Sequence, residues 1–305
     1  MSIEVRDGFV VNPTVEVTPT IRISPFMECD LGMVAEDATC AKDYLNQRFH
    51  SYCLTIKARE AIKVALTFYD LSTDDVVTIF TTSNNYYVSG CVTRTIETMC
   101  KWSREITEKT KVILVIHEFG YPCLNMKEIL QYGLPIIEDC ALSFASNDQD
   151  RMTGKTGDFA IYSLPKFFPM QIGGVLVSHK YDLSTLSPQI TEEQESFILR
   201  SLSLYVPLLS DMLQKRMNNY EYLQENLSGL GVQPFFSLVE GTYPAVYLFK
   251  WAEDMDYSLL KEYMQGNGIE ASVFYGKSAF FVPIHHRLSK QHLDYIITLL
   301  KQFAP

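Results

Sequence analysis

Two short segments of this chain carry residue types that are used in covalent catalysis. Leu134–Ala141 is an apolar run that reaches Asp139, and Tyr162–Gly174 carries Lys166 and ends in two glycines. An apolar run before an acid is typical of a buried strand that delivers a carboxylate at its C-terminal edge, and paired glycines are typical of a loop lying against a flat group. A lysine amine can bind an aldehyde covalently, while a carboxylate can keep a pyridine nitrogen protonated. Neither residue is specific alone, but together they predict a pyridoxal-phosphate site.

Lys166 also has a second interpretation, as a surface lysine on a proline-flanked loop. Its neighbours Leu164, Pro165, Phe167 and Phe168 predict aromatic, partly dry surroundings. Such surroundings disfavour the charged form of an amine and make it a usable nucleophile near neutral pH. With Asp139 upstream, 27 positions away, we expect the catalytic interpretation to hold.

Composition predicts a large core and two domains. The 305 residues are 47% hydrophobic and 20% charged, with a formal net charge of −10. We expect a large cofactor-binding domain over residues 1–185, and linking helices with a small C-terminal domain over residues 186–305. The acidic balance argues against a partner with a phosphate backbone, so we expect no nucleic-acid partner.

Cysteine and histidine usage predicts neither disulfides nor a metal site. All seven cysteines lie in the first half of the chain without a C-x-x-C pair, and His285 and His286 lack ligand spacing. The N-terminal residues do not form a secretory signal, and we find no apolar stretch of the about 18 residues that span a bilayer. We therefore expect a cytoplasmic protein without a membrane partner.

The pattern of elements predicts an α/β fold. Helical periodicity at 58–69 and 126–131 alternates with short apolar or β-branched runs at 52–56, 76–80, 111–116, 134–137, 159–162 and 174–178. Such alternation is typical of a mostly parallel mixed sheet sandwiched by helices, with ligands at the carboxyl ends of the strands. Thr191–Gln194 has the form of a capping box, and the elements that follow predict a smaller α+β module.

At these motifs the chain resembles the DegT/StrS-type sugar aminotransferases, a branch of the fold type I pyridoxal-phosphate enzymes. The resemblance is carried by Ile106–Tyr121, Ile137–Ala141 and Gly157–Lys166, with further matches at 268–272 and 282–289. It implies that Lys166 binds the cofactor covalently, that Asp139 pairs with its pyridine nitrogen, and that Ser163 donates to its phosphate.

The resemblance extends to the phosphate turn and to a stacking ring, with departures. The family opens a helix beneath the phosphate with a glycine-containing turn, whereas this chain has Ile56–Ala61 there. The backbone N–H groups of Ala58 and Arg59 are the candidates for binding the phosphate. The alternative is that the charged side chains of this turn are only solvated. Tyr87 or its neighbour Tyr86 is the candidate stacking ring, unless both pack under their loop. Leu142 replaces a polar residue, and little room remains between Arg94 and Ile106 for a strand that relatives carry.

The resemblance implies an aminotransferase that converts a keto sugar, which we expect to be nucleotide-linked, to an amino sugar with glutamate as donor. A divergent relative with a regulatory or scaffold role is the alternative that the departures motivate. Retention of Lys166 argues against a sugar dehydratase. A homodimer is also implied, and Phe197–Leu209 is apolar on enough helical faces either to meet a partner or to bridge two domains.

Overall fold

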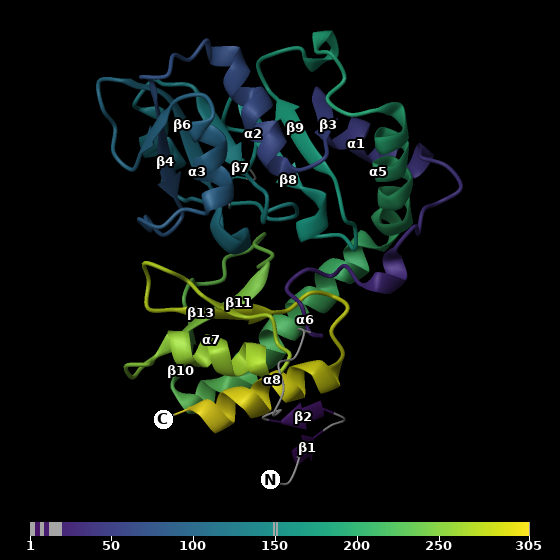
Figure 1. Ribbon diagram of the computed structural model, residues 1–305, viewed down its shortest axis with the longest axis vertical. Coiled ribbons are helices and arrows are strands. Elements are labelled where there is room, and N and C mark those ends of the chain that lie inside the picture. Colours follow the sequence, from purple (N-terminus) through teal and green to yellow (C-terminus); the bar gives the residue numbers. More distant parts are fainter. Residues whose placement is uncertain (1–3, 7–8, 12–19, 149, 151, 305) are drawn as a thin grey trace. The chain divides into compact units, whose positions relative to one another are not determined.

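The computed structural model describes residues 4–6, 9–11, 20–148, 150 and 152–304. The chain divides into two compact units (Figure 1). The larger unit comprises Phe26–Leu209 with Val239–Thr242, and the smaller comprises Ser210–Leu238 and Tyr243–Pro305 with the residues before Phe26. The expected domain border at residue 185 stays a prediction; the border between these compact units falls instead at Leu209.

The larger unit is built on a seven-stranded sheet in the order β3-β9-β8-β7-β6-β4-β5. Its strands are β3 (Tyr52–Thr55), β4 (Val76–Thr81), β5 (Lys101–Ser103), β6 (Thr110–Ile116), β7 (Ile136–Asp139), β8 (Phe159–Ser163) and β9 (Gly174–Ser178). All neighbours from β5 to β8 pair in parallel, whereas β9 is antiparallel to both β8 and β3. The expected mostly parallel mixed sheet is confirmed.

Helices cover both faces of this sheet. They are α1 (Thr39–Arg48), α2 (Ala58–Leu66), α3 (Gly90–Glu97), α4 (Met126–Leu130) and α5 (Glu192–Tyr205). Figure 1 shows α2 and α3 lying across one face, where their apolar side chains form a common core with Ile137 and Ile161. On the other face α4 packs against Ile113 and Ile136. Successive strand residues point to opposite faces, so each strand contributes to both cores.

The short strand β5 corrects one expectation. We expected little room for an extra strand between Arg94 and Ile106, but Lys101–Ser103 pairs in parallel with Val76–Thr78 of β4. Three residues are enough because the partner strand supplies the hydrogen-bonding edge.

The smaller unit is an α+β module, as predicted from its pattern. Its four-stranded sheet has the order β10-β11-β13-β12 and is antiparallel throughout. The strands are β10 (Val232–Pro234), β11 (Val246–Trp251), β12 (Ser272–Val273) and β13 (Phe280–Pro283), and the helices are α6 (Leu209–Leu227), α7 (Tyr257–Gly266) and α8 (Lys290–Phe303). Ile21 bridges to Ile269 in this unit, which ties the N-terminal segment to it. A two-stranded hairpin, β1 (Glu4–Arg6) with β2 (Phe9–Val11), precedes that segment.

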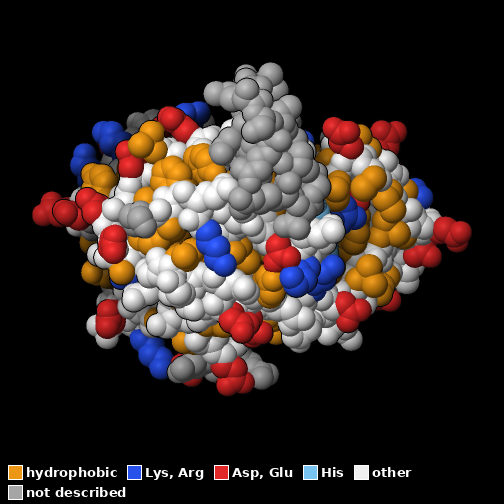
Figure 2. All heavy atoms as spheres, turned by 90° about the horizontal axis from the view of Figure 1, so that it is seen from below, with side chains coloured by type: hydrophobic (Ala, Val, Ile, Leu, Met, Phe, Trp, Pro, Cys, Tyr) orange, Lys and Arg blue, Asp and Glu red, His pale blue; other side chains and the backbone are white. Residues whose placement is uncertain are grey.

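One helical run within the described residues has the length and apolar composition of a membrane-crossing helix, which the sequence analysis did not expect. This run, Glu192–Leu230, is interrupted by Pro207 between α5 and α6, and 39% of its most apolar window is buried inside the protein. A core helix of a water-soluble protein passes the same test. On the described surface drawn in Figure 2, acidic and basic side chains are interspersed with apolar ones rather than gathered by charge.

Candidate active site

The predicted residues meet at the carboxyl edge of the parallel strands. Asp139, the last residue of β7, is in register with Ile116 of β6 and Ile161 of β8, and Ser163 ends β8 two residues further on. Alternation along β7 and β8 places Asp139 and Ser163 on the sheet face of Ile137 and Ile161. That face is covered by α2 and α3, so the predicted phosphate turn at the start of α2 lies on the same side as Asp139.

Asp139 is a buried carboxylate with one oxygen available. Its side chain is 7% exposed, and Oδ1 accepts a hydrogen bond from the Ala141 N–H at 2.9 Å. The other oxygen accepts no hydrogen bond from the described part of the chain. Burial raises the pKa of Asp139, and the Ala141 N–H and the nearby Lys166 ammonium oppose that rise. A positively charged N–H placed at the available oxygen would therefore be bound strongly.

Lys166 ends a short 3-10 helix, Leu164–Lys166, that is anchored from within the core. Phe167 and Phe168 are buried, and their rings lie 5.6 and 5.0 Å from the ring of Phe144. The Lys166 side chain itself is exposed. The expectation of aromatic, partly dry surroundings for this amine is thus wrong, because the rings that flank it in sequence turn into the core.

The glycine pair joins the start of α2 to the ends of β8 and β9. Gly173 donates its N–H to the Ile56 carbonyl at 2.8 Å and accepts from the Leu164 N–H at 2.9 Å. Gly174 pairs with both Thr55 of β3 and Ser163 of β8. These contacts bring the predicted turn and Ser163 to adjacent positions at one edge of the sheet.

The first turn of α2 offers backbone amides to an anion. The Glu60 carboxylate accepts from the N–H groups of Ile56 and Lys57, at 3.0 and 3.2 Å, and so caps the helix. The amides of Ala58 and Arg59 follow in the first turn of the helix. Their N–H groups have no hydrogen-bond acceptor within the helix, because the carbonyls four residues earlier precede it. The Arg59 side chain is exposed, so its guanidinium is accessible without being fixed.

Tyr87 lies on the loop after β4, at the same edge. The loop is held by Asn85, whose N–H donates to Thr81 Oγ1 at 2.9 Å and whose carbonyl accepts from Arg104 at 2.6 Å. Tyr86 and Tyr87 are 78% and 51% exposed, so neither ring is packed beneath the loop. Either ring is therefore accessible to a bound group.

Sequence reasoning missed one member of this edge. Glu138, fully buried, forms a hydrogen bond with His117 at 3.0 Å. An acid inside an otherwise apolar strand, directly before Asp139, was the available signal. His117 is 1% exposed, and its Nδ1 accepts a hydrogen bond from the Cys123 N–H at 3.0 Å.

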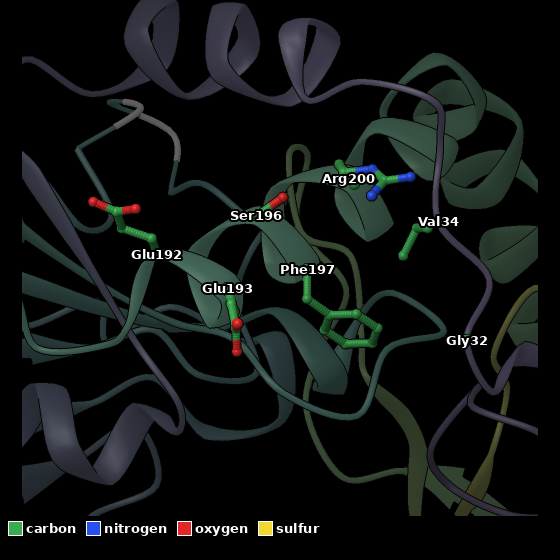
Figure 3. Close-up of a pocket in the computed structure, with 7 residues that line it drawn as sticks. All are labelled: Gly32, Val34, Glu192, Glu193, Ser196, Phe197 and Arg200. Atoms are coloured by element: carbon green, nitrogen blue, oxygen red, sulfur yellow. The ribbon is translucent and has the colours of Figure 1, made fainter.

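A separate pocket lies between α5 and the segment before α1 (Figure 3). It is lined by Gly32, Val34, Glu192, Glu193, Ser196, Phe197 and Arg200. The two carboxylates lie at the far end from Arg200, whose Nε donates to the Ala35 carbonyl at 2.7 Å. None of the predicted site residues lines this pocket, and among the described residues no group of histidine, cysteine and acidic side chains could hold a metal ion.

Comparison with known structures identifies the class of fold. The chain is similar to a protein assigned as a sugar aminotransferase of Streptococcus pneumoniae, solved in its PMP form, with a TM-score of 0.72 and 15% identity. That match covers 95% of this chain and 98% of the other. The fold is thus that of the solved aminotransferases, as expected.

Sequence comparisons find similarity to one family over part of the chain. Residues 92–185 match the DegT/DnrJ/EryC1/StrS aminotransferase family. The chain is also similar to GDP-perosamine synthase of Escherichia coli O157:H7, 34% identical over 25% of this chain and 22% of the relative. It is 28% identical to dTDP-3-amino-3,6-dideoxy-alpha-D-galactopyranose transaminase of Aneurinibacillus thermoaerophilus, over 40% of this chain and 39% of the relative. The matches therefore span less than half the length of these curated relatives. The similarity to the DegT/DnrJ/EryC1/StrS aminotransferase family thus covers residues 92–185, about a third of the chain.

Proposed function

We propose that the protein is a pyridoxal-phosphate-dependent aminotransferase that converts a keto sugar to an amino sugar, with glutamate as the amino donor. Two relatives are named for amino sugars carried on GDP or dTDP, which supports a nucleotide-linked substrate. The family similarity and the fold support the class of reaction. The residues at the sheet edge that contains Asp139 support that edge as the site of the reaction.

The residues at this edge fit pyridoxal phosphate. The available oxygen of Asp139 suits a protonated pyridine nitrogen, and Lys166 provides an accessible amine close to it. Ser163 and the amides of Ala58 and Arg59 suit a phosphate, and Tyr87 is accessible for stacking on the ring. When bound, the cofactor would supply an electron sink for the bond-breaking step.

Each residue then has a defined task. Lys166 would hold the cofactor, and its amine would move a proton to and from the substrate carbon as general base and acid. Asp139 would keep the pyridine nitrogen protonated by accepting a charge-assisted hydrogen bond from its N–H. The anchored 3-10 helix limits the positions that Lys166 can reach, because Phe167 and Phe168 fix its backbone.

One observation carries this proposal: a buried carboxylate with a free oxygen lies near a lysine at the carboxyl edge of the sheet. The test is to incubate the purified protein with pyridoxal phosphate and to record its visible spectrum before and after adding glutamate. We expect absorbance from lysine-bound cofactor that bleaches with glutamate, and no such absorbance for Lys166→Ala. A colourless wild-type protein at saturating cofactor would contradict the proposal.

A regulatory or scaffold role is the second candidate. The α2 turn lacks the family's glycine, and Leu142 offers no hydrogen bond where relatives place a polar residue. Cofactor binding without bleaching, in the presence of both glutamate and glutamine as donors, would favour this role over transamination.

A further inference from the structure

Glu138 accepts four hydrogen bonds, from His117 and from the loop at 154–157. Its Oε2 accepts from His117 Nε2 at 3.0 Å and from the Gly154 N–H at 2.9 Å. Its Oε1 accepts from the N–H groups of Thr156 and Gly157, at 2.7 and 2.8 Å. The side chain is completely buried, so these four donors replace its entire hydration.

The hydrogen-bond pattern fixes the charge of both partners. His117 Nδ1 accepts from the Cys123 N–H at 3.0 Å, so the ring proton is on Nε2 and points at Glu138. The imidazole is therefore neutral and Glu138 is the acceptor. Both Glu138 oxygens accept two hydrogen bonds each, so no lone pair is left for a proton and the side chain is the carboxylate.

Glu138 and His117 are also connected to the backbone around Asp139. The His117 N–H donates to the Asp139 carbonyl at 3.0 Å, and Ser143 Oγ donates to the His117 carbonyl at 3.1 Å. His117 therefore links the segments on both sides of Asp139 to the end of β6, while Glu138 links β7 to the loop at 154–157. Strand alternation points Glu138 to the sheet face opposite Asp139, so it does not reach a group bound at Asp139.

We propose that Glu138 and His117 are positioning residues that hold the Asp139–Cys140 segment in one conformation, with Glu138 ionised and His117 neutral. Their relevance to a cofactor rests on the function proposed above, whereas their hold on the segment does not. Glutamine at position 138 offers one acceptor oxygen and turns an NH2 group toward backbone donors, so at least two of the four hydrogen bonds are lost.

The protonation state has its own test. In spectra of ¹⁵N-histidine-labelled protein without cofactor, the His117 signal is the one missing from His117→Gln. We expect the ¹⁵N signals of a neutral ring with its proton on Nε2, because Nδ1 accepts from the Cys123 N–H. A protonated ring, or a proton on Nδ1, would overturn the assignment.

The hold on the segment is tested by thiol labelling of the cofactor-free protein, read by peptide mass spectrometry. Cys140 is completely buried next to Asp139, while Cys100, 5% exposed, lies in the α2/α3-side core and is an internal control. In Glu138→Gln we expect Cys140 to react about tenfold faster, with Cys100 unchanged, because only the local segment opens. The milder His117→Gln keeps a donor toward Glu138 and should give a smaller increase; it replaces Glu138→Gln if that variant does not fold.

Asp158→Asn is the matched acid-to-amide control, because Asp158 precedes β8 at the opposite end of the strand and pairs with Lys180 at 3.2 Å. It should leave Cys140 labelling unchanged. Equal acceleration of Cys140 and Cys100 in Glu138→Gln, or no acceleration, would overturn the proposal. The affinity for pyridoxal phosphate is then measured on the same proteins. We expect the Kd of Glu138→Gln to be roughly tenfold higher, an effect typical of losing a residue that orients a ligand-binding group. A wild-type protein that does not bind the cofactor would defeat the proposed function, while the labelling still decides the role of Glu138.

Discussion

Gly174 lies so close to the start of α2 that a Cβ atom built on it would come within 2.7 Å of the Ala58 amide nitrogen. The same atom would lie 2.3 Å from Thr55 Oγ1. This contact fixes the distance between β9 and the turn that we assign to the phosphate. The turn at the start of α2 has no glycine, but Gly174 of β9, which faces that turn, is a glycine.

Gly174→Ala should both destabilise the protein and weaken cofactor binding. The new methyl group meets backbone atoms that cannot move aside easily, and overpacking of this kind typically costs about 1–3 kcal/mol. Denaturant unfolding measures the loss, and a titration with pyridoxal phosphate measures the affinity. Gly229→Ala is the control, since a Cβ atom there meets nothing within 4 Å. Equal stability and affinity for the two variants would contradict the role of this contact.

Asp139→Asn should separate stability from activity. Burial raises the pKa of Asp139 in the folded protein above its value in the unfolded chain. Ionisation of Asp139 therefore lowers the free energy of unfolding as the pH rises above the pKa of the unfolded chain. Asparagine keeps the Ala141 hydrogen bond but cannot ionise. Without cofactor, the variant should melt at or above the wild-type temperature at pH 7, and the difference should vanish at about pH 3, below the usual aspartate value.

Turnover by Asp139→Asn should fall by orders of magnitude, because a neutral amide cannot hold the pyridine nitrogen charged and each ~1.4 kcal/mol of barrier is tenfold in rate. Steady-state kinetics with glutamate measure this. A variant that is both less stable at neutral pH and normally active would refute both parts of the assignment.

Tyr87→Ala should weaken cofactor binding more than Tyr86→Ala. Tyr87 donates its backbone N–H to Asn85 Oδ1 at 3.3 Å and is the less exposed of the two rings. Loss of one aromatic contact typically costs about 0.5–1.5 kcal/mol beyond its buried area. The measurement is the Kd of pyridoxal phosphate for both variants. A larger effect for Tyr86→Ala would transfer the stacking role to that residue.

The protein should be a homodimer in solution. Four large side chains of Phe197–Leu209 are buried, namely Ile198, Leu199, Leu202 and Tyr205, but Leu208 is 49% exposed. In the same larger unit Leu31 is 58% exposed, and burial of such side chains would favour symmetric pairing. Light scattering gives the mass; a monomer that binds cofactor and transaminates would exclude the dimer.

The sequence predicted the parts of this site that depend on local pattern. Asp139 and Ser163 end strands whose apolar, β-branched residues define them without help from the rest of the chain. The exposure of Lys166 could not be predicted, because it depends on rings that pack on Phe144, over twenty residues away in sequence. Strand β5 escaped notice because Lys101–Ser103 is short, contains no β-branched residue and is ordered by pairing with β4. The N-terminal segment joins the smaller unit through the bridge of Ile21 to Ile269, which no local pattern indicates.

The central claim is that Lys166 carries the cofactor, and the most direct measurement is borohydride reduction of the pyridoxal-phosphate-loaded protein followed by peptide mapping. Reduction makes the bond between lysine and cofactor permanent, so the labelled peptide identifies the residue. The account predicts one pyridoxyl group per chain, on Lys166, and none on Lys166→Ala. An adduct on Lys57 or Lys155 instead, or no adduct on the wild-type protein, would contradict it.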